Sequence, residues 1–161
     1  MTRLPPRARI DIEAPLDLVW SVMLDVERYA EWNPFVERIE SPVPPQVGDP
    51  IRLHVVFGNG KRVVSPERVT ALRPPYDDEG TGRAALVYVY EGLPARLRLV
   101  RGTRFQHLSQ APGGPTHYDT HEEFSGPLVG LAGPGRVADG FRRHAEALKS
   151  RSERLHADQR R

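Results

Sequence analysis

Residues 14–35 read APLDLVWSVMLDVERYAEWNPF, and this stretch decides the fold. Pro15 suits the start of a helix, because the first helical turn does not use its missing N–H group. Apolar residues then recur at helical spacing, at Val19, Trp20, Val22, Met23 and Val26. A second short helix over 28–32 is expected to end before Pro34, since the residue preceding a proline disfavours helical backbone. The stretch therefore predicts a pair of short helices early in the chain.

Strand patterns surround this helical stretch. Residues 7–13 alternate, as a half-buried strand does, with Ala8, Ile10 and Ile12 on one side. Beyond residue 35 we expect strands over 36–40, 51–57, 61–72, 84–90, 96–110 and 116–124. Asn59-Gly60 predicts a hairpin turn. Residues 73–82 are expected to form a loop.

The last part of the sequence has an amphipathic helical pattern. From residue 136 onward, one face carries Val137, Phe141, Ala145 and Leu148. Pro134 fits the first turn of this helix. Gly140 costs a helix about 1 kcal/mol relative to alanine, so it indicates a close approach to the sheet or to a ligand. We expect flexible tails at residues 1–6 and about 153–161.

Composition excludes several classes of function. The 161 residues, 39% of them hydrophobic, fit one globular domain. A net charge of +2 is too small to indicate nucleic-acid binding, and the absence of cysteine excludes disulfides and thiolate chemistry. No apolar run approaches the ~20 residues of a spanning helix, and no signal-peptide pattern is present, so we expect a cytoplasmic protein without membrane insertion. The sequence also lacks a phosphate-binding loop and a nucleophile-elbow motif.

Two sets of residues carry a resemblance to a known family. The first follows the opening strand and consists of Pro15, Val19-Trp20, Asp25, Tyr29 and Trp32-Asn33-Pro34. The second ends the last strand and reads Glu122-x-Phe124-Ser125-Gly126. Together with the order of the elements, they resemble the START-like or SRPBCC superfamily, and most of all its polyketide cyclase/dehydrase and lipid-transport branch.

This resemblance implies an α+β helix-grip fold like that of the birch pollen allergen. In such a fold, a curved seven-stranded antiparallel sheet wraps around the long C-terminal helix, and two short helices lie between the first and second strands. Residues 1–161 would form one such domain.

A helix-grip fold leaves space between its two parts. One helix is only about 10 Å wide and cannot fill a concave sheet of seven strands. Since aromatic residues make up 7% of the chain, we expect an apolar cavity of about 300–1,000 Å³. We expect it to be lined by Trp32, Phe35, Leu53, Val55, Phe57, Phe105, Tyr118, Thr120, Val137 and Phe141.

One candidate catalytic residue lies on the last strand. Tyr118 and Phe124 indicate which face of this strand points inward, and Glu122 shares that face. A carboxyl group in such a place either has a raised pKa and acts as an acid or base, or is bound to an arginine or to the backbone.

Three further candidates lie on the two preceding strands. His107 shares a face with Phe105, and it either transfers a proton or is hydrogen-bonded within the cavity wall. Tyr88 and Tyr90 share a face of a strand that is apolar on both sides, so either face can line the cavity. Their hydroxyl groups point into the cavity or their rings only pack.

A possible metal site lies on the opposite face of the last strand. His117, Asp119 and His121 are of metal-ligating types, and alternate residues of a strand lie about 6.7 Å apart. We expect this face to be convex and solvated, and the resembled family needs no metal. We therefore predict neither a metal nor another cofactor.

Three functions are consistent with the sequence. The first is binding of a hydrophobic small molecule, such as a lipid, polyketide or terpenoid, by a monomer or homodimer. The second is a polyketide aromatase/cyclase that uses the polar residues of the cavity to polarise carbonyls and move protons. The third is a protein-interaction or chaperone-regulator module, which would need an exposed apolar patch outside the cavity.

Overall fold

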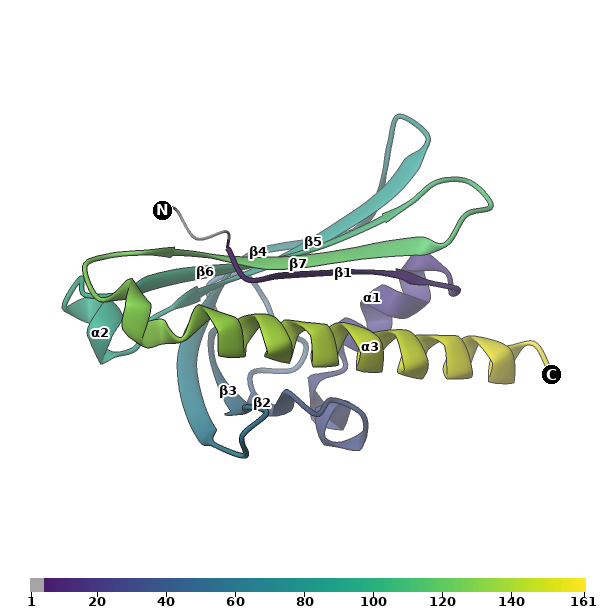
Figure 1. Ribbon diagram of the computed structural model, residues 1–161. Helices are drawn as coiled ribbons and strands as arrows, with labels where there is room; N and C mark the ends of the chain where they lie inside the picture. The colour runs from purple at the N-terminus through teal and green to yellow at the C-terminus, as the bar shows by residue number, and fades with distance from the viewer. Residues whose placement is uncertain (1–4) are drawn as a thin grey trace.

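An antiparallel sheet of seven strands curls around the C-terminal helix (Figure 1). The computed structural model describes residues 5–161. The strands follow the order β1-β7-β6-β5-β4-β3-β2 across the sheet. Their bounds are β1 Arg7–Ile12, β2 Val36–Glu40, β3 Pro50–Val56, β4 Arg62–Asp78, β5 Thr81–Tyr90, β6 Arg101–Gln110 and β7 Thr116–Ser125. The predicted α+β helix-grip fold is confirmed.

The helices join and cover the strands. They are α1 Leu16–Leu24, the 3-10 helix η1 Val26–Glu31, α2 Leu93–Arg96, the 3-10 helix η2 Val129–Ala132 and α3 Pro134–Gln159. The first two form the predicted pair between β1 and β2, and α1 buries the apolar stripe read from its sequence. The long helix α3 lies along the concave side of the sheet (Figure 1).

The β4–β5 hairpin is longer than its sequence predicts. Residues 73–82 were expected to form a loop, but β4 continues to Asp78 and pairs there with Thr81. The two prolines that favoured a loop lie in an irregularity of the pairing between Arg73 and Tyr76. Strand pairing continues beyond this irregularity, and the chain turns at Glu79 and Gly80, which both have positive φ. The hairpin at Asn59-Gly60 is confirmed, with a hydrogen bond of 2.9 Å from Phe57 N to Lys61 O.

The start of β6 also differs from the prediction. A strand was expected from residue 96, but residues 93–96 form the short helix α2 and β6 begins at Arg101. Pro94 lies in the first turn of α2, where its missing N–H costs nothing. The chain then reverses through Arg98, which has a φ of 57°.

Helix α3 continues where a flexible tail was expected. It extends to Gln159, because side chains near residue 153 tie it to the rest of the fold. Arg151 pairs with Glu31 of η1 at 2.8 Å, and Glu153 accepts a hydrogen bond from Glu13 N at 2.9 Å. At the other end of the chain, residues 1–4 of the expected tail lie outside the described residues, and Pro6 O accepts a hydrogen bond from Glu122 N at 3.0 Å.

Asn33 joins α3 to the beginning of β2. Its Oδ1 accepts hydrogen bonds from the backbone N–H groups of Phe35 and Val36, both at 3.0 Å. Its Nδ2 donates to Nδ1 of His144 at 2.7 Å, in the buried middle of α3. Burial and the nearby Arg104 charge hold the pKa of His144 well below its usual value, so the ring is neutral and can accept this bond. We call Asn33, Phe35, Val36 and His144 the Asn33 junction.

Gly140 marks the closest approach of α3 to this junction. A Cβ atom at Gly140 would lie 2.1 Å from the Phe35 ring. This ring packs edge-on against that of Phe141, with the ring centroids 6.0 Å apart. We expect Gly140→Ala to lower the free energy of unfolding by about 1–2 kcal/mol, because overpacking outweighs the better helix propensity of alanine. Urea denaturation measures this change. Gly135→Ala, in the same helix but facing open space, should be neutral or stabilising. Equal stabilisation by both changes would show that the ring moves freely.

Candidate functional site

A cavity of about 380 Å³ lies between the sheet and the N-terminal half of α3. Six of the residues predicted to line it do so: Phe35, Leu53, Val55, Phe57, Val137 and Phe141. They come from β3, α3 and the segments that flank β2 and β3, and they form an apolar wall. The rings of Phe35 and Phe57 meet edge-on at 6.1 Å, which holds this wall in place.

Two predicted cavity residues lie on the outer face of the sheet instead. Phe105 and His107 point away from α3, and their rings stack with His121 of β7. The Phe105 and His121 ring centroids are 4.9 Å apart. The inner face of β6 carries Arg104 and Gln106, which are both buried. The prediction that Phe105 and His107 face the cavity is therefore wrong, because the aromatic ring of this strand packs on the convex side.

Three other predicted residues do not line the cavity; Tyr118 and Thr120 are buried and Trp32 is partly buried. The Tyr118 hydroxyl donates to Gln106 Oε1 at 2.8 Å. Thr120 Oγ1 accepts from Arg104 Nε at 3.2 Å. Trp32 packs against Tyr29, with ring centroids 4.9 Å apart, and so supports the Asn33 junction. These side chains hold the cavity wall without lining it.

One end of the cavity is polar. Glu122 faces inward, as predicted, and its cross-strand partner on β6 is Arg104. Tyr88 of β5 is the partner of Arg104 on the other side, so three inward side chains form one row across the sheet. In the neighbouring row, Glu67 of β4 pairs with Tyr90 of β5, and both line the cavity. Opposed Cβ atoms in such a row are about 5 Å apart, which places Glu122 beside Arg104. Glu67 lies close enough for the charge of Arg104 to act on the pKa of its carboxyl group.

The two tyrosines share the inner face of β5. Tyr90 lines the cavity, whereas Tyr88 is buried beside it. Burial raises the pKa of the Tyr88 hydroxyl well above its usual value, so this group is a neutral hydrogen-bonding group near neutral pH. The sequence left open which face of this strand lines the cavity, and in the structure it is the face that carries Tyr90.

Arg104 is unusually enclosed for an arginine, with 4% of its surface exposed. Its guanidinium lies 4.4 Å from the centre of the Phe141 ring, a distance at which a cation is attracted to an aromatic face. Nε donates to Thr120, but Nη2 is buried without a hydrogen-bond partner among the residues that the structure describes. Arg104 therefore brings a fixed positive charge and an unused donor to the polar end of the cavity.

The two carboxyl groups differ from ordinary glutamates. Burial raises the pKa of Glu122 to about 8, with a further rise from the charge of Glu67 and an opposing effect of Arg104. Burial also raises the pKa of Glu67 to about 7, against the effects of a hydrogen bond from Ser65 at 3.0 Å and of Arg104. Near neutral pH, this pair therefore keeps at least one proton. Such a site can donate a proton and polarise a carbonyl oxygen.

Sequence reasoning missed Arg104 and Glu67. Phe105 was taken to face inward. Because neighbouring residues of a strand face opposite sides of the sheet, Arg104 was then assigned to the outer face. The signal that would have corrected this is the pairing with β7: an inward Glu122 requires an inward partner on β6. Glu67 follows from no pattern within its own strand, which alternates poorly near Pro66.

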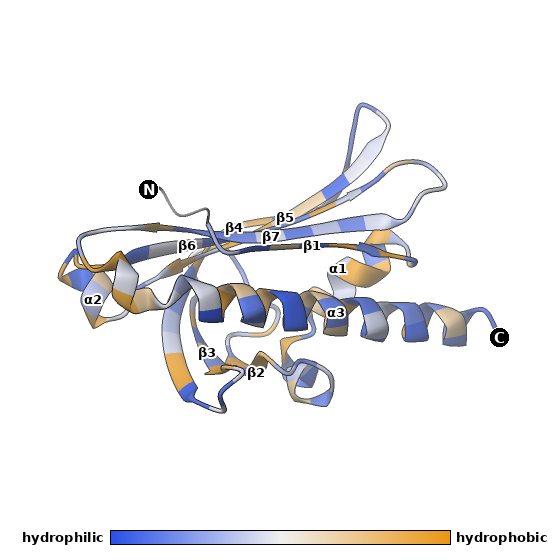
Figure 2. Cartoon of the chain, viewed as in Figure 1, coloured by the Kyte–Doolittle hydropathy of each residue, from blue (hydrophilic) through white to orange (hydrophobic). Residues whose placement is uncertain are grey.

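Exposed leucines lie in two segments that contribute residues to the cavity lining. The exposed fractions of Leu93 and Leu97, in and after α2, are 66% and 59%, and those of Leu128 and Leu131, around η2, are 40% and 75%. Figure 2 shows these two segments as hydrophobic patches at the same end of the molecule. No helix within residues 5–161 has the length and apolar character needed to cross a membrane. Leu128 and Leu131 also line the cavity, so this exposed apolar surface is continuous with the apolar wall.

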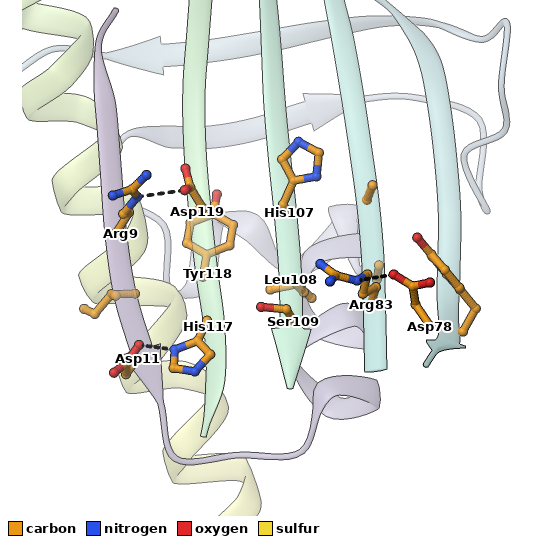
Figure 3. A pocket seen from close by; sticks show the side chains of 14 residues that line it. Arg9, Asp11, Asp78, Arg83, His107, Leu108, Ser109, His117, Tyr118 and Asp119 are labelled. Atoms are coloured by element: carbon orange, nitrogen blue, oxygen red, sulfur yellow. Dashed lines mark hydrogen bonds and ion pairs between the residues drawn. The ribbon is translucent and has the colours of Figure 1, made fainter. Parts of the chain in front are cut away.

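A second hollow of about 660 Å³ lies on the outer face of β1, β7, β6, β5 and the end of β4 (Figure 3). Its charged side chains pair with one another: Arg9 with Asp119 at 2.8 Å, His117 with Asp11 at 2.5 Å, and Arg83 with Asp78 at 2.6 Å. Asp119 also pairs with Arg7, which lowers the pKa of this carboxyl group.

The predicted outward direction of His117 and Asp119 is confirmed, and both side chains pair with charged residues of β1. In the described part of the chain, no three metal-ligating side chains converge.

Comparison with known proteins identifies the same fold. A family model described as "Polyketide cyclase / dehydrase and lipid transport" matches residues 7–153. No curated protein matches the sequence significantly.

Among solved structures, a hypothetical protein from Helicobacter pylori shares 13% identity with a TM-score of 0.67, covering 91% of this chain and 86% of its own. Major latex-like protein 151 from Panax ginseng shares 12% identity with a TM-score of 0.62, covering 93% and 95%. The di-domain ARO/CYC protein BexL, from the BE-7585A biosynthetic pathway, shares 14% identity with a TM-score of 0.62. That match covers 94% of this chain and 49% of BexL, so this chain spans about half of BexL.

Proposed function

Since this chain belongs to the polyketide cyclase / dehydrase and lipid transport family, we propose that it binds an apolar small molecule in the cavity between the sheet and α3. The observation that carries this proposal is the aromatic and aliphatic wall around about 380 Å³ of space. This volume lies within the range of about 300–1,000 Å³ that is usual for ligand pockets. A lipid, a polyketide or a terpenoid-like molecule fits this description.

The proposed path of the ligand runs from the exposed leucines to the polar end. Leu128, Leu131 and Phe141 line the cavity, and the Phe141 ring is in contact with Arg104 at the polar end. Burial of an apolar ligand along this path gains about 25 cal/mol for each Å² removed from water. The exposed leucines contribute to entry, so they give no separate support to the protein-interaction hypothesis.

A tryptophan at the cavity rim tests the proposal. Val63 lines the cavity, whereas Val64, the next residue of β4, faces the outside. We expect Val63→Trp to weaken binding of the neutral apolar dye Nile red about tenfold, because the indole fills part of the cavity. Val64→Trp should leave dye affinity unchanged. Fluorescence titration measures both affinities, and native mass spectrometry of the protein from its own host identifies a retained ligand. Equal dye binding by the two variants would contradict binding in this cavity.

A second candidate function is supported by the polar end. In a cyclase, Arg104 would polarise a ketone, ionised Glu67 would remove a proton next to a second carbonyl, and protonated Glu122 would supply a proton to the resulting alkoxide as the carbon–carbon bond forms. His107, a predicted catalytic candidate, lies too far outside to take part. Loss of water from a linear poly-β-ketone surrogate in the presence of the protein, followed by mass spectrometry, would distinguish catalysis from binding alone.

A further inference from the structure

We propose that Arg104 receives the carboxylate of an apolar organic acid, so that the cavity selects acidic amphiphiles over neutral lipids of the same size. This inference rests on the proposed function and specifies its ligand class. It begins from one observation: a buried guanidinium that lines the cavity has an Nη2 without a hydrogen-bond partner among the described residues.

Arg104 has an unused donor at Nη2. A guanidinium has five N–H groups in a planar fork, and within the described residues this one donates through Nε to Thr120. Its face is covered by Phe141, so further partners must approach its edge. The arrangement that matches such an edge is a carboxylate, whose two oxygens accept parallel hydrogen bonds. A buried charge without such a partner is costly, and an incoming carboxylate removes that cost.

The neighbouring glutamates do not take this place. Glu67 accepts its hydrogen bond from Ser65 at 3.0 Å. Glu122 lies over Gly102, where an added Cβ atom would be 2.5 Å from its Oε1. Gly102 therefore provides the space that Glu122 occupies, two residues along β6 from Arg104. Neither carboxyl group bonds to Arg104, and its Nη2 is left without a hydrogen-bond partner among the described residues.

The surroundings of Arg104 are otherwise neutral at slightly acidic pH. The titratable groups near it are Glu67, Glu122, Tyr29, Tyr88, Tyr118 and His144. Burial keeps the three tyrosines protonated and His144 unprotonated. With pKa values of about 7 and about 8, Glu67 and Glu122 are largely neutral at pH 6.5. The guanidinium is then the dominant charge at this end, and it attracts an anion. At pH 9 both glutamates are ionised and repel it.

Isothermal titration calorimetry with three matched probes tests the inference. We expect decanoate to bind the wild-type protein at least about tenfold more tightly than decanol or methyl decanoate at pH 6.5. Arg104→Met should remove this preference, leaving decanoate and decanol with similar affinities. Arg154→Met makes the same change at an exposed position of α3 and should keep the preference. Equal affinity of the three probes for the wild type, or a preference that survives in Arg104→Met, would overturn the inference.

The pH dependence gives a readout that needs no variant. The preference for decanoate should decrease from pH 6.5 to pH 9, and binding at pH 7.5 should take up protons, seen as different heats in phosphate and Tris buffers. A preference that is constant over this range would overturn the inference even if Arg104→Met did not fold. If decanol binds as well as decanoate, only the ligand class is wrong. If neither these probes nor Nile red bind, the proposed function fails as well.

Discussion

Asn33→Ala is expected to lower the free energy of unfolding by about 3 kcal/mol. The change leaves two buried backbone donors, the N–H groups of Phe35 and Val36, without their acceptor. It also removes the donor that satisfies His144 Nδ1 inside α3. Each buried polar group left unpaired costs about 1–3 kcal/mol. Urea denaturation monitored by circular dichroism measures the loss.

The chain offers a matched control, because its other asparagine is exposed. Asn59 accepts a hydrogen bond from Lys61 N at 3.0 Å in a surface hairpin, and Asn59→Ala should cost less than about 0.5 kcal/mol. Asn33→Asp separates the two parts of the junction. It keeps both backbone contacts, but its carboxylate favours a protonated His144. The loss in the free energy of unfolding relative to the wild type should therefore become smaller as the pH falls. A similar cost for Asn33→Ala and Asn59→Ala would show that the junction contributes little.

Glu122→Gln is expected to stabilise the protein by about 2 kcal/mol at pH 9 and to leave its stability nearly unchanged at pH 5. The folded protein raises the pKa of Glu122 from 4.5 to about 8, so between these values the folded state binds more protons than the unfolded state. In the wild type, the Glu122 carboxyl group therefore contributes fully to the free energy of unfolding below pH 4.5, and this contribution is lost as the pH rises through 8. One pKa unit corresponds to about 1.4 kcal/mol, and the expected gain is smaller than the full shift because Glu67 still ionises.

The neighbouring residue provides the control for this prediction. Glu123 lies on the opposite, exposed face of β7, so Glu123→Gln should change stability by the same small amount at pH 5 and pH 9. Thermal unfolding at both pH values measures the four differences. A stability difference between Glu122→Gln and wild type that does not grow with pH would mean that this carboxyl group is solvated rather than buried.

The order of elements could be predicted because local signals agree with the fold. The early helix pair, the Asn59-Gly60 turn and the apolar face of α3 each appear within a few residues of sequence. The same holds for the inner face of β7, where Tyr118 and Phe124 indicate the direction of Glu122. Six residues of the apolar cavity wall were identified in this way, since large apolar side chains on and next to β3 and α3 face inward.

The polar end of the cavity could not be predicted in the same way. Arg104 and Gln106 face inward, where each makes one hydrogen bond with the adjacent strand: Arg104 Nε donates to Thr120, and Gln106 Oε1 accepts from Tyr118. Phe105 faces outward because it stacks on His121. These preferences arise between strands that are distant in sequence, and the alternation within β6 alone favours the opposite face. The extension of β4 past its prolines has the same origin, since pairing with β5 outweighs the local turn preference.

The attachment of α3 is uneven along its length. Arg143 Nη2 donates to Val56 O at 2.9 Å, and Lys149 Nζ donates to Asp11 O at 2.8 Å. Before these anchors, the helix begins at Gly133, in left-handed backbone next to the short η2 segment. If the cavity holds a guest molecule as proposed, its exchange would therefore need a movement of residues 129–133, which follow the 3.0 Å bond from Leu128 N to Leu99 O, rather than detachment of the helix. Substitutions in this short segment would then change the residence time of the guest with little effect on overall stability.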